Sequence, residues 1–337
     1  MAHKVALLGA GRIGVMHGRI LADLGKQLVI ADPATDRAAT LAQELGAEVA
    51  TEDEVFAPGN PLGLDAAVLA SPTSEHARQL IAAAAVGLPT FSEKPLAMDI
   101  ASAREAVEAL EAAGLPHHIG FQRRFDVAYT RARDARISGA LGEVRRFHML
   151  TADQFPPDDS YIPTSGGIFR DCNIHDFDII RWVTGAEVAE VYATGSQRGR
   201  AVYAEFDDLS EATAILTLDD ETVGTVHSSR YNGQGYDVRL DLAGTDGSAN
   251  VGYDNKLPIV SMEDGVDYPP EEPWTDFIAR FLPCYRAELE AFFEMVDGDR
   301  PSPCEARDAL EALYVAVAAD ISRHERRPVK IDEVRNG

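Results

Sequence analysis

The sequence predicts an α/β fold class with two domains: an N-terminal parallel sheet with crossover helices, and a C-terminal α+β domain with a largely antiparallel open sheet. Three observations predict it. The chain has 337 residues, a length that suggests about two domains. Short apolar strands alternate with helices up to Phe121, and alternating apolar and polar residues follow. We therefore expect domains at residues 1–121 and 122–337.

Strands and helices alternate through the first domain. Apolar segments bounded by turn residues predict strands at 4–8, 28–31, 66–70, 90–92 and 117–120. The first predicted helix ends at about Leu24, and three further helices are predicted at 37–45, 75–86 and 102–113. Because helices of this length between short strands form right-handed crossovers, the pattern predicts a parallel sheet.

Alternating apolar and polar residues predict the strands of the second domain, at 144–151, 188–195, 212–218, 222–229, 236–242 and 248–251. Such alternation, with turn residues between the strands, is typical of an antiparallel sheet with one covered face. Apolar stripes predict helices at 127–138, 285–296 and 305–324, and a last strand is expected at 328–331. Prolines at 269, 270 and 273 predict an exposed loop.

Charge and cysteine content exclude several classes of protein. With 31 Lys and Arg against 55 Asp and Glu, the net charge is −24, which disfavours binding to nucleic acid or to an anionic membrane surface. No apolar run approaches the roughly 18 residues of a membrane span, and we expect no cleavable leader. The three cysteines, Cys172, Cys284 and Cys304, form neither a disulfide framework nor a zinc motif. We expect a cytoplasmic protein.

A glycine-rich turn, Gly9-Ala10-Gly11-Arg12-Ile13-Gly14, joins the first strand to the first helix. Gly9 permits the tight turn, Gly11 lets a pyrophosphate approach the backbone, and Gly14 allows close packing of the helix on the strand. The N-terminus of the helix offers backbone N–H groups and a positive dipole end to that pyrophosphate. The turn therefore predicts a Rossmann dinucleotide-binding domain.

Asp32 ends the second strand and favours NAD as the dinucleotide. A carboxylate at this place accepts hydrogen bonds from both ribose hydroxyls and repels a 2′-phosphate. Arg37 leaves NADP open, because a nearby arginine can accommodate that phosphate; the simpler interpretation is a solvated residue at the start of a helix. His76, just after Pro72-Thr73, either lines the cofactor site or lies on the surface beside a helix start.

Four further strings follow the turn: SEKP at 92–95, GFQRRFD at 120–126, GG at 166–167 and DCNIHDFD at 171–178. Together with GAGRIG they resemble the Gfo/Idh/MocA oxidoreductase family, in both domains and in the expected order. The GFQRRFD string is similar to that of the inositol dehydrogenases within the family. The resemblance implies NAD-dependent oxidation of a polyol ring hydroxyl to a ketone, most simply myo-inositol to 2-keto-myo-inositol. Another inositol isomer or a sugar remains an alternative substrate.

The resemblance also implies roles for individual residues. It makes Lys94, Asp171 and His175 the catalytic set, with no metal. Besides the three glycines, the expected cofactor contacts are Arg12, Ile13, Asp32, Arg37, Ser71, Thr73, His76, Glu93 and Lys94. Besides the catalytic set, the expected substrate contacts are Arg123, Asp153, Cys172, Asn173, Asp178 and Tyr236. Relatives pair through the open face of the second sheet, which implies a homo-oligomer, a dimer or a tetramer.

The segment after Gly166-Gly167 points to acid–base chemistry without the family. At about 100° per residue, an α-helix places Asp171, His175 and Asp178 within one arc, beside an apolar side. An imidazole with a reference pKa of about 6.5 suits the removal of an alcohol proton. A solvated polar face is the simpler alternative for one acid–histidine pair. A metal site is disfavoured because no zinc-type cysteine spacing accompanies these residues.

The predicted mechanism gives one task to each catalytic residue. His175 takes the proton of the reacting hydroxyl, Asp171 stabilises the imidazolium, and Lys94 donates a hydrogen bond to the same oxygen. Lys94 is one of only five lysines, so the composition disfavours a lysine at any given position. A non-catalytic regulatory protein that binds the cofactor is the second alternative, and the intact catalytic set argues against it.

Overall fold

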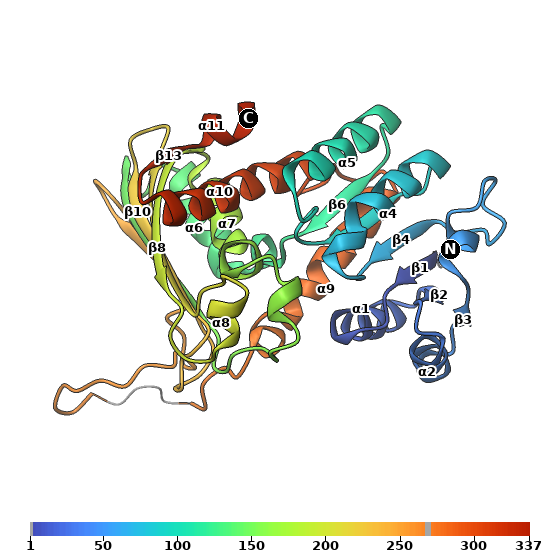
Figure 1. Ribbon diagram of the computed structural model, residues 1–337, viewed down its shortest axis with the longest axis horizontal. Helices are drawn as coiled ribbons and strands as arrows, with labels where there is room; N and C mark the ends of the chain where they lie inside the picture. Colours follow the sequence, from blue (N-terminus) through green and yellow to red (C-terminus); the bar gives the residue numbers. More distant parts are fainter. Residues whose placement is uncertain (1–2, 267–270) are drawn as a thin grey trace. The chain divides into compact units, whose positions relative to one another are not determined.

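The computed structural model describes residues 3–266 and 271–337 and divides into two compact units (Figure 1). The first comprises Met1–Gln122 and Tyr285–Leu310, and the second Arg123–Cys284 and Glu311–Gly337. The sequence placed 285–310 in the second domain, whereas these residues make their contacts within the first unit. The expected loop at Pro269-Pro270 lies outside the described residues.

A six-stranded parallel sheet forms the centre of the first unit, with strand order β3-β2-β1-β4-β5-β6. Its strands are β1 (Lys4–Leu8), β2 (Gln27–Ala31), β3 (Glu48–Val49), β4 (Ala66–Leu69), β5 (Thr90–Glu93) and β6 (His117–Gly120). The connecting helices are α1 (Arg12–Asp23), α2 (Thr35–Leu45), α3 (Glu52–Val55), α4 (Thr73–Val86) and α5 (Ile100–Ala113). The strand order reverses direction at β1, and in such sheets ligands bind beyond the carboxyl ends of the strands at that point.

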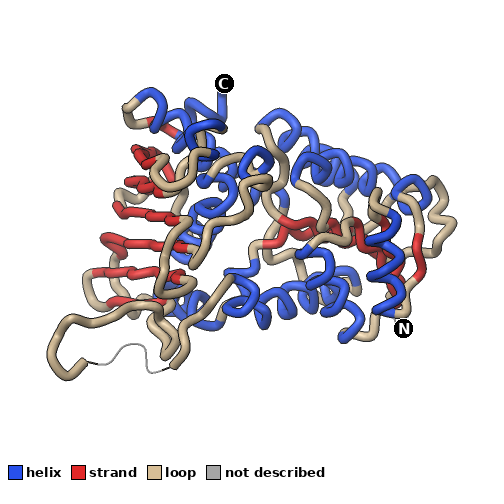
Figure 2. The backbone as a smooth tube through the Cα atoms, turned by 60° about the horizontal axis from the view of Figure 1, so that its bottom comes forward, coloured by secondary structure: helices blue, strands red, loops and turns tan. Residues whose placement is uncertain are grey.

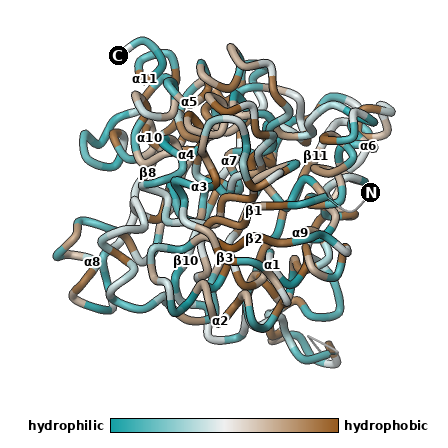
Figure 3. The backbone as a smooth tube through the Cα atoms, turned by 90° about the vertical axis from the view of Figure 1, so that its right-hand side faces the viewer, coloured by the Kyte–Doolittle hydropathy of each residue, from teal (hydrophilic) through white to brown (hydrophobic). Residues whose placement is uncertain are grey.

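Helices cover both faces of this sheet, with α4 and α5 on one side and α1 and α2 on the other (Figure 1). The central strands are therefore apolar throughout, as Figure 3 shows for β1 and β2. All four residues of β4 are fully buried. Continuous apolar runs of this kind are what a doubly covered parallel sheet requires, so the predicted fold of this unit is confirmed.

A seven-stranded sheet forms the second unit, with strand order β12-β11-β7-β10-β9-β8-β13. Its strands are β7 (Val144–Ala152), β8 (Val188–Ser196), β9 (Glu211–Leu218), β10 (Val223–Ser229), β11 (Asp237–Gly244), β12 (Ser248–Val251) and β13 (Val329–Lys330). Every neighbouring pair is antiparallel except β7 and β10. Figure 2 shows helices on one face of these strands, which agrees with the predicted open sheet.

The remaining helices belong to the second unit wholly or in part. They are α6 (Val127–Ile137), α7 (Ile174–Thr184), α8 (Val202–Glu205), α9 (Phe277–Val296), α10 (Ala306–Glu325) and α11 (Ile331–Asn336). Three short helical turns join them: 3-10 turns at Gln122–Phe125 and Ile162–Thr164, and a π-helix, η3, at Phe169–Asn173. Helix α9 begins at Phe277 and contains Pro283, whereas the sequence predicted a start after this proline. Within 3–266 and 271–337, no helix is long and apolar enough to span a bilayer.

Candidate functional site

The glycine-rich turn between β1 and α1 has the shape that a pyrophosphate needs. Gly9 has a φ of +100°, and a Cβ there would lie 2.5 Å from the carbonyl oxygen of Ala70. A Cβ on Gly14 would lie 1.9 Å from the carbonyl oxygen of Gly9, so helix and turn pack without side chains between them. A Cβ on Gly11 would meet no atom within 4 Å. The space beside Gly11, at the N-terminus of α1, is therefore open to an anion.

Asp32 lies beyond the end of β2, beside this turn. Its carboxylate accepts hydrogen bonds from the backbone N–H groups of Ala10 and Ala34, each at 2.7 Å, and from Arg37 at 3.0 Å. Burial would raise the pKa of Asp32, but these hydrogen bonds lower it below the ordinary value. A carboxylate has about four acceptor positions, so the ionised group keeps capacity for a ribose hydroxyl. Arg37 is thus an exposed residue that pairs with Asp32 through one of its five N–H donors.

The other predicted cofactor residues of the first unit follow β4 and β5 at the same edge of the sheet. Ser71 donates through its hydroxyl to Gln79 at 2.6 Å, and Thr73 begins α4. His76 is buried, with its ring nitrogens 2.8 Å from the Pro95 carbonyl oxygen and 2.9 Å from that of Ser71. Lys94 directly follows β5, and the Lys94-Pro95 peptide bond is cis. Parallel strands therefore bring these segments to the edge that carries the glycine-rich turn.

Three neighbouring strands of the second unit end or begin beside one another at one edge. Ser229 of β10 pairs with Ala152 of β7, and Asp237 of β11 pairs with the same Ala152. The residues one step further, Arg230, Asp153 and Tyr236, therefore stand side by side. The Asp153 carboxylate raises the pKa of the buried Tyr236 in addition to the effect of burial. Two of the predicted substrate residues, Asp153 and Tyr236, are thus brought together.

Asp171 lies close to this end of the strands, because Arg230 forms an ion pair with it. The Arg230 guanidinium is buried and donates to Asp171 at 3.1 Å and to Asp208 at 3.1 Å. The Tyr161 hydroxyl donates to the other oxygen of Asp171 at 2.9 Å, and the negative charge of Asp171 raises the pKa of Tyr161. The thiol of Cys172 lies 3.9 Å from Asp171. Asp171 is thus a held carboxylate beside a half-buried thiol.

His175 lies in the first turn of α7, four residues after Asp171, and is half-buried. The predicted continuous α-helix through these residues is wrong, because Asp171 belongs to the π-helix η3 and only His175 belongs to α7. The wider π turn changes the angle between the two side chains, so the arc expected at 100° per residue does not apply. Single π turns inside helices are frequent at functional sites.

Two predicted substrate residues have buried partners instead of an open face. Asp178 is fully buried and accepts two hydrogen bonds from Arg124, at 2.9 and 2.5 Å. Arg123 is 1% exposed and donates to Asp176 at 2.5 Å and to Thr151 at 2.9 Å. The Nε atom of Arg123 has no acceptor among the described residues. Contact of Arg123 or Asp178 with substrate stays a prediction.

The sequence analysis missed Arg230, Tyr161 and Asp176. The sequence signal for Arg230 was limited to its place directly after a predicted strand, and only the pairing of β7 with β10 places it beside Asp153. No local pattern marked Tyr161, which lies in an irregular segment ten residues before Asp171. Asp176 belongs to the DCNIHDFD string at 171–178, but only the fold shows that it pairs with Arg123.

Comparison with known proteins gives a consistent family. Residues 3–121 match a model described as an oxidoreductase family with an NAD-binding Rossmann fold. Residues 129–250 match the model of the GFO/IDH/MocA C-terminal domain. The two matches cover both parts of the chain, in the order that the resemblance predicted.

Individual relatives match over nearly their whole length. The scyllo-inositol 2-dehydrogenase (NAD(+)) of Bacillus subtilis is 34% identical, over 99% of this chain and 98% of that protein. The myo-inositol 2-dehydrogenase of Thermotoga maritima is 30% identical, over 98% and 99%. The crystal structure of scyllo-inositol dehydrogenase from Lactobacillus casei with NAD(H) and scyllo-inositol has a TM-score of 0.89 at 26% identity, over 98% and 100%. The chain belongs to the Gfo/Idh/MocA family of NAD-binding oxidoreductases.

Proposed function

We propose that this protein oxidises a ring hydroxyl of a cyclic polyol to a ketone with NAD⁺, and that myo-inositol is the substrate. The observation that carries the proposal is the pair of sites: an open glycine turn beside the ionised Asp32, and a polar cluster of Asp153, Asp171, Arg230 and Tyr236 near His175. A cluster of donors and acceptors of both charges suits a neutral molecule with many hydroxyls. The relatives named above act on myo- and scyllo-inositol, so scyllo-inositol is the second candidate.

The residues of the first unit fit the dinucleotide. The backbone beside Gly11 would hold the pyrophosphate, because nothing occupies the space where a Cβ would project. Asp32 would accept from the ribose hydroxyls, and Arg37 neutralises part of its charge at 3.0 Å. When bound there, NAD⁺ supplies the acceptor for the hydride of the alcohol carbon.

The chain's own residues then handle the proton. His175 removes the proton of the reacting hydroxyl as general base. Asp171, held by Arg230 and Tyr161, favours the protonated imidazole through its negative charge. Lys94 donates a hydrogen bond to the reacting oxygen and stabilises the negative charge that develops on it.

An absorbance screen tests the substrate. The purified protein with NAD⁺ is expected to form NADH with myo-inositol at a higher kcat/KM than with scyllo-inositol, D-chiro-inositol or glucose. A higher value for scyllo-inositol would replace the proposed substrate with the second candidate. No NADH formation with any of the four compounds would contradict the polyol proposal.

Replacing Asp32 with alanine is expected to weaken NAD binding and to narrow the preference for NAD over NADP. The reason is the loss of an acceptor for the ribose hydroxyls, together with the loss of a charge that repels the 2′-phosphate. Kd values for both dinucleotides, measured by fluorescence titration, check this. Asp36→Ala is the matched control, because Asp36 directly precedes Arg37 on α2, whereas the Arg37 side chain pairs with Asp32. An unchanged ratio of the two Kd values would remove Asp32 from the cofactor site.

A second copy of this chain is the partner we propose for the outer face of the seven-stranded sheet. Tyr192, Ile215 and Val223 are 39%, 50% and 47% exposed there, and Tyr192 pairs with Ile215 in one row of the sheet. An exposed apolar face of this kind is typical of an interface between copies. Light scattering after size exclusion is expected to give at least twice the single-chain mass of 36.5 kDa. A species of 36.5 kDa at micromolar concentration would contradict it. The three cysteines form no disulfide among the described residues, which supports a cytoplasmic location.

A further inference from the structure

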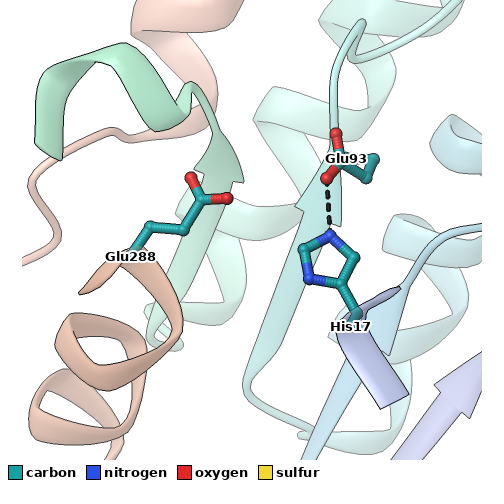
Figure 4. A group of neighbouring side chains, drawn as sticks. All are labelled: His17, Glu93 and Glu288. Carbon is teal, nitrogen blue, oxygen red and sulfur yellow. Dashed lines mark hydrogen bonds and ion pairs between the residues drawn. The ribbon is translucent and has the colours of Figure 1, made fainter. Parts of the chain in front are cut away.

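Three ionisable side chains meet inside the first unit, and one of them directly precedes Lys94. They are His17 of α1, Glu93 at the end of β5 and Glu288 of α9, and Figure 4 shows them facing one another. The Nε2 atom of His17 lies 2.6 Å from Glu93 Oε1. One ligand-type atom from each of the three residues lies within 4.8 Å of the others. His17 and Glu288 are fully buried.

Glu288 has no hydrogen-bond partner for either carboxyl oxygen within the described part of the chain. Burial raises the pKa of Glu288 well above its ordinary value, and the charge of Glu93 raises it further. A buried carboxyl beside a second carboxyl avoids the cost of ionisation by keeping its proton. Glu288 faces Glu93 from β5 and His17 from α1. Tyr285, which lies on the same helix as Glu288, packs against the His17 ring. Phe91 packs between His17 and a further titratable group, His118 of β6, with ring centroids 5.4 Å from each.

Glu93 is confined from several sides, and it directly precedes Lys94. His17 holds its carboxylate, and Glu288 faces it across the cluster. On β6, a Cβ at Gly120 would lie 3.5 Å from the carboxyl carbon and from Oε2 of Glu93, so the bare backbone lies against this group. The side chain of Glu93 therefore has little freedom to move.

A second histidine holds the residue on the other side of Lys94. The Nδ1 atom of His76, from α4, lies 2.8 Å from the carbonyl oxygen of Pro95. Burial lowers the pKa of His76, so the ring is neutral and one N–H donates a hydrogen bond to one of the two carbonyl oxygens beside it. Lys94 is thus flanked by two residues that each contact a buried histidine from a different helix.

We propose that His17 and Glu288 are positioning residues for Lys94. The neutral acid of Glu288 lets Glu93 keep a single negative charge against His17, and that contact fixes the backbone from which the Lys94 side chain starts. If Glu288 were ionised, two carboxylates would repel each other in a buried site, and Glu93 would move. This inference rests on the proposed function for the role of Lys94, but the protonation of Glu288 does not depend on it.

The protonation is tested without substrate, by urea unfolding of the wild type and Glu288→Gln between pH 4.5 and 9. Because the pKa of Glu288 is raised in the folded protein, Glu288 is protonated in both the folded and the unfolded chain when the pH is below its ordinary pKa of 4.5. As pH rises, the unfolded chain releases a proton that the folded chain keeps, so the wild type loses stability while the glutamine variant does not. The difference in urea midpoint is expected to grow with pH in favour of Glu288→Gln. A difference in urea midpoint that stays constant with pH would contradict the protonated state of Glu288. So would elemental analysis that finds one mole of divalent metal per chain.

The positioning role is tested by steady-state kinetics with the polyol that the wild type oxidises. His17→Asn and Glu93→Gln are each expected to lower kcat at least tenfold. Because His17 is not an expected cofactor contact, the Kd for NAD is expected to change less than threefold in His17→Asn. The double variant is expected to show no further loss, because both changes break the same contact. Glu288→Ala is expected to lower kcat, and Glu288→Gln to restore most of it.

The control is Val107→Ala, which removes buried volume from α5 of the same unit. It is expected to lower the melting temperature without lowering kcat. Additive losses in the double variant, or an equal loss of kcat in Val107→Ala, would overturn the positioning role. A wild type that oxidises no polyol would contradict the proposed function alone, because the urea experiment still reports on Glu288.

Discussion

Replacing His175 with alanine is expected to lower kcat by about 10²–10⁴-fold, the contribution of a general base, while the Kd for NAD is expected to stay within about threefold of the wild type. The loss is expected to fall on kcat because, in the proposed mechanism, His175 takes the proton as the alcohol is oxidised. NAD binding is expected to persist because the proposed cofactor contacts, the glycine-rich turn and Asp32, belong to the other unit. Stopped-flow NADH formation and fluorescence titration with NAD measure the two quantities.

The matched control is His148→Ala, because His148 is exposed on β7 of the same unit and its ring forms a hydrogen bond with Thr225, at 2.9 Å. Its kcat is expected to stay within about twofold. Turnover of His175→Ala close to that of the wild type would remove His175 from the mechanism. An equal loss in both variants would indicate damage to the unit instead of loss of a base.

The pH profile separates a base from a structural histidine. An imidazole that must be neutral to accept the proton gives the wild type a fall in kcat/KM at acidic pH. His175→Ala is expected to lose that acidic limb and to show a nearly flat profile at its lower rate. Persistence of the limb in the variant would assign it to another group.

The fold of the first unit could be predicted from the sequence because each of its strands and turns is marked by the residues that form it. Each buried strand is an apolar run, and each turn at the carboxyl edge contains residues with restricted roles, such as Gly9 with its φ of +100°. The elements observed from β1 to β6 therefore match the predicted ones within a few residues, except for β3 and α3. These two are only two and four residues long, too short for a periodic pattern.

The second unit was harder to predict because its site depends on contacts between distant segments. The strands themselves alternate clearly, as in β9, where Ala212, Ala214 and Leu216 are buried. The pairing of β7 with β10 places Arg230 beside Asp153, and nothing in either strand alone indicates that pairing. The π-helix at Phe169–Asn173 also lacks a sequence pattern, so the angle between Asp171 and His175 could not be predicted.

Glu288 shows the same limit for a buried acid. In the sequence it lies on a helix with an apolar stripe, where a glutamate is ordinarily solvated. Glu288 lies beside Glu93, 195 positions earlier in the chain, only because residues 285–310 belong to the first unit. The cofactor half of the site was predictable from one continuous motif, whereas this cluster combines three segments far apart in the chain.

Replacing Asp176 with alanine is expected to lower the free energy of unfolding by about 3–5 kcal/mol, the cost of leaving one member of a buried ion pair alone. Asp176 is fully buried and accepts from Arg123 at 2.5 Å, from Thr151 at 2.8 Å and from Asn173 at 3.1 Å. Burial alone would lower the pKa of Arg123, but the charge of Asp176 raises it above the ordinary value. Without Asp176, the guanidinium stays charged in the interior, and the Thr151 hydroxyl is its remaining acceptor within the described residues.

Urea unfolding measures this loss, and the double variant Arg123→Met/Asp176→Leu shows its origin. Two apolar side chains of similar size remove both charges, so the double variant is expected to regain most of the stability lost in Asp176→Ala. A double variant as unstable as Asp176→Ala would mean that packing around Asp176, and not the unpaired charge, sets the cost. A change below about 1 kcal/mol in Asp176→Ala would contradict the buried pair itself.

The same double variant also tests whether Arg123 touches substrate. Two of its guanidinium nitrogens are occupied by Asp176 and Thr151, and only Nε lacks an acceptor among the described residues. If Arg123 serves the fold alone, the stable double variant keeps the wild-type KM for the polyol. If Nε donates to a substrate hydroxyl, KM rises about tenfold or more while stability is restored, because a lost hydrogen bond from a charged group costs about 1.5–3 kcal/mol. Since the apolar pair removes the unpaired charge, a rise in KM then reports on the contact with substrate rather than on a weakened fold.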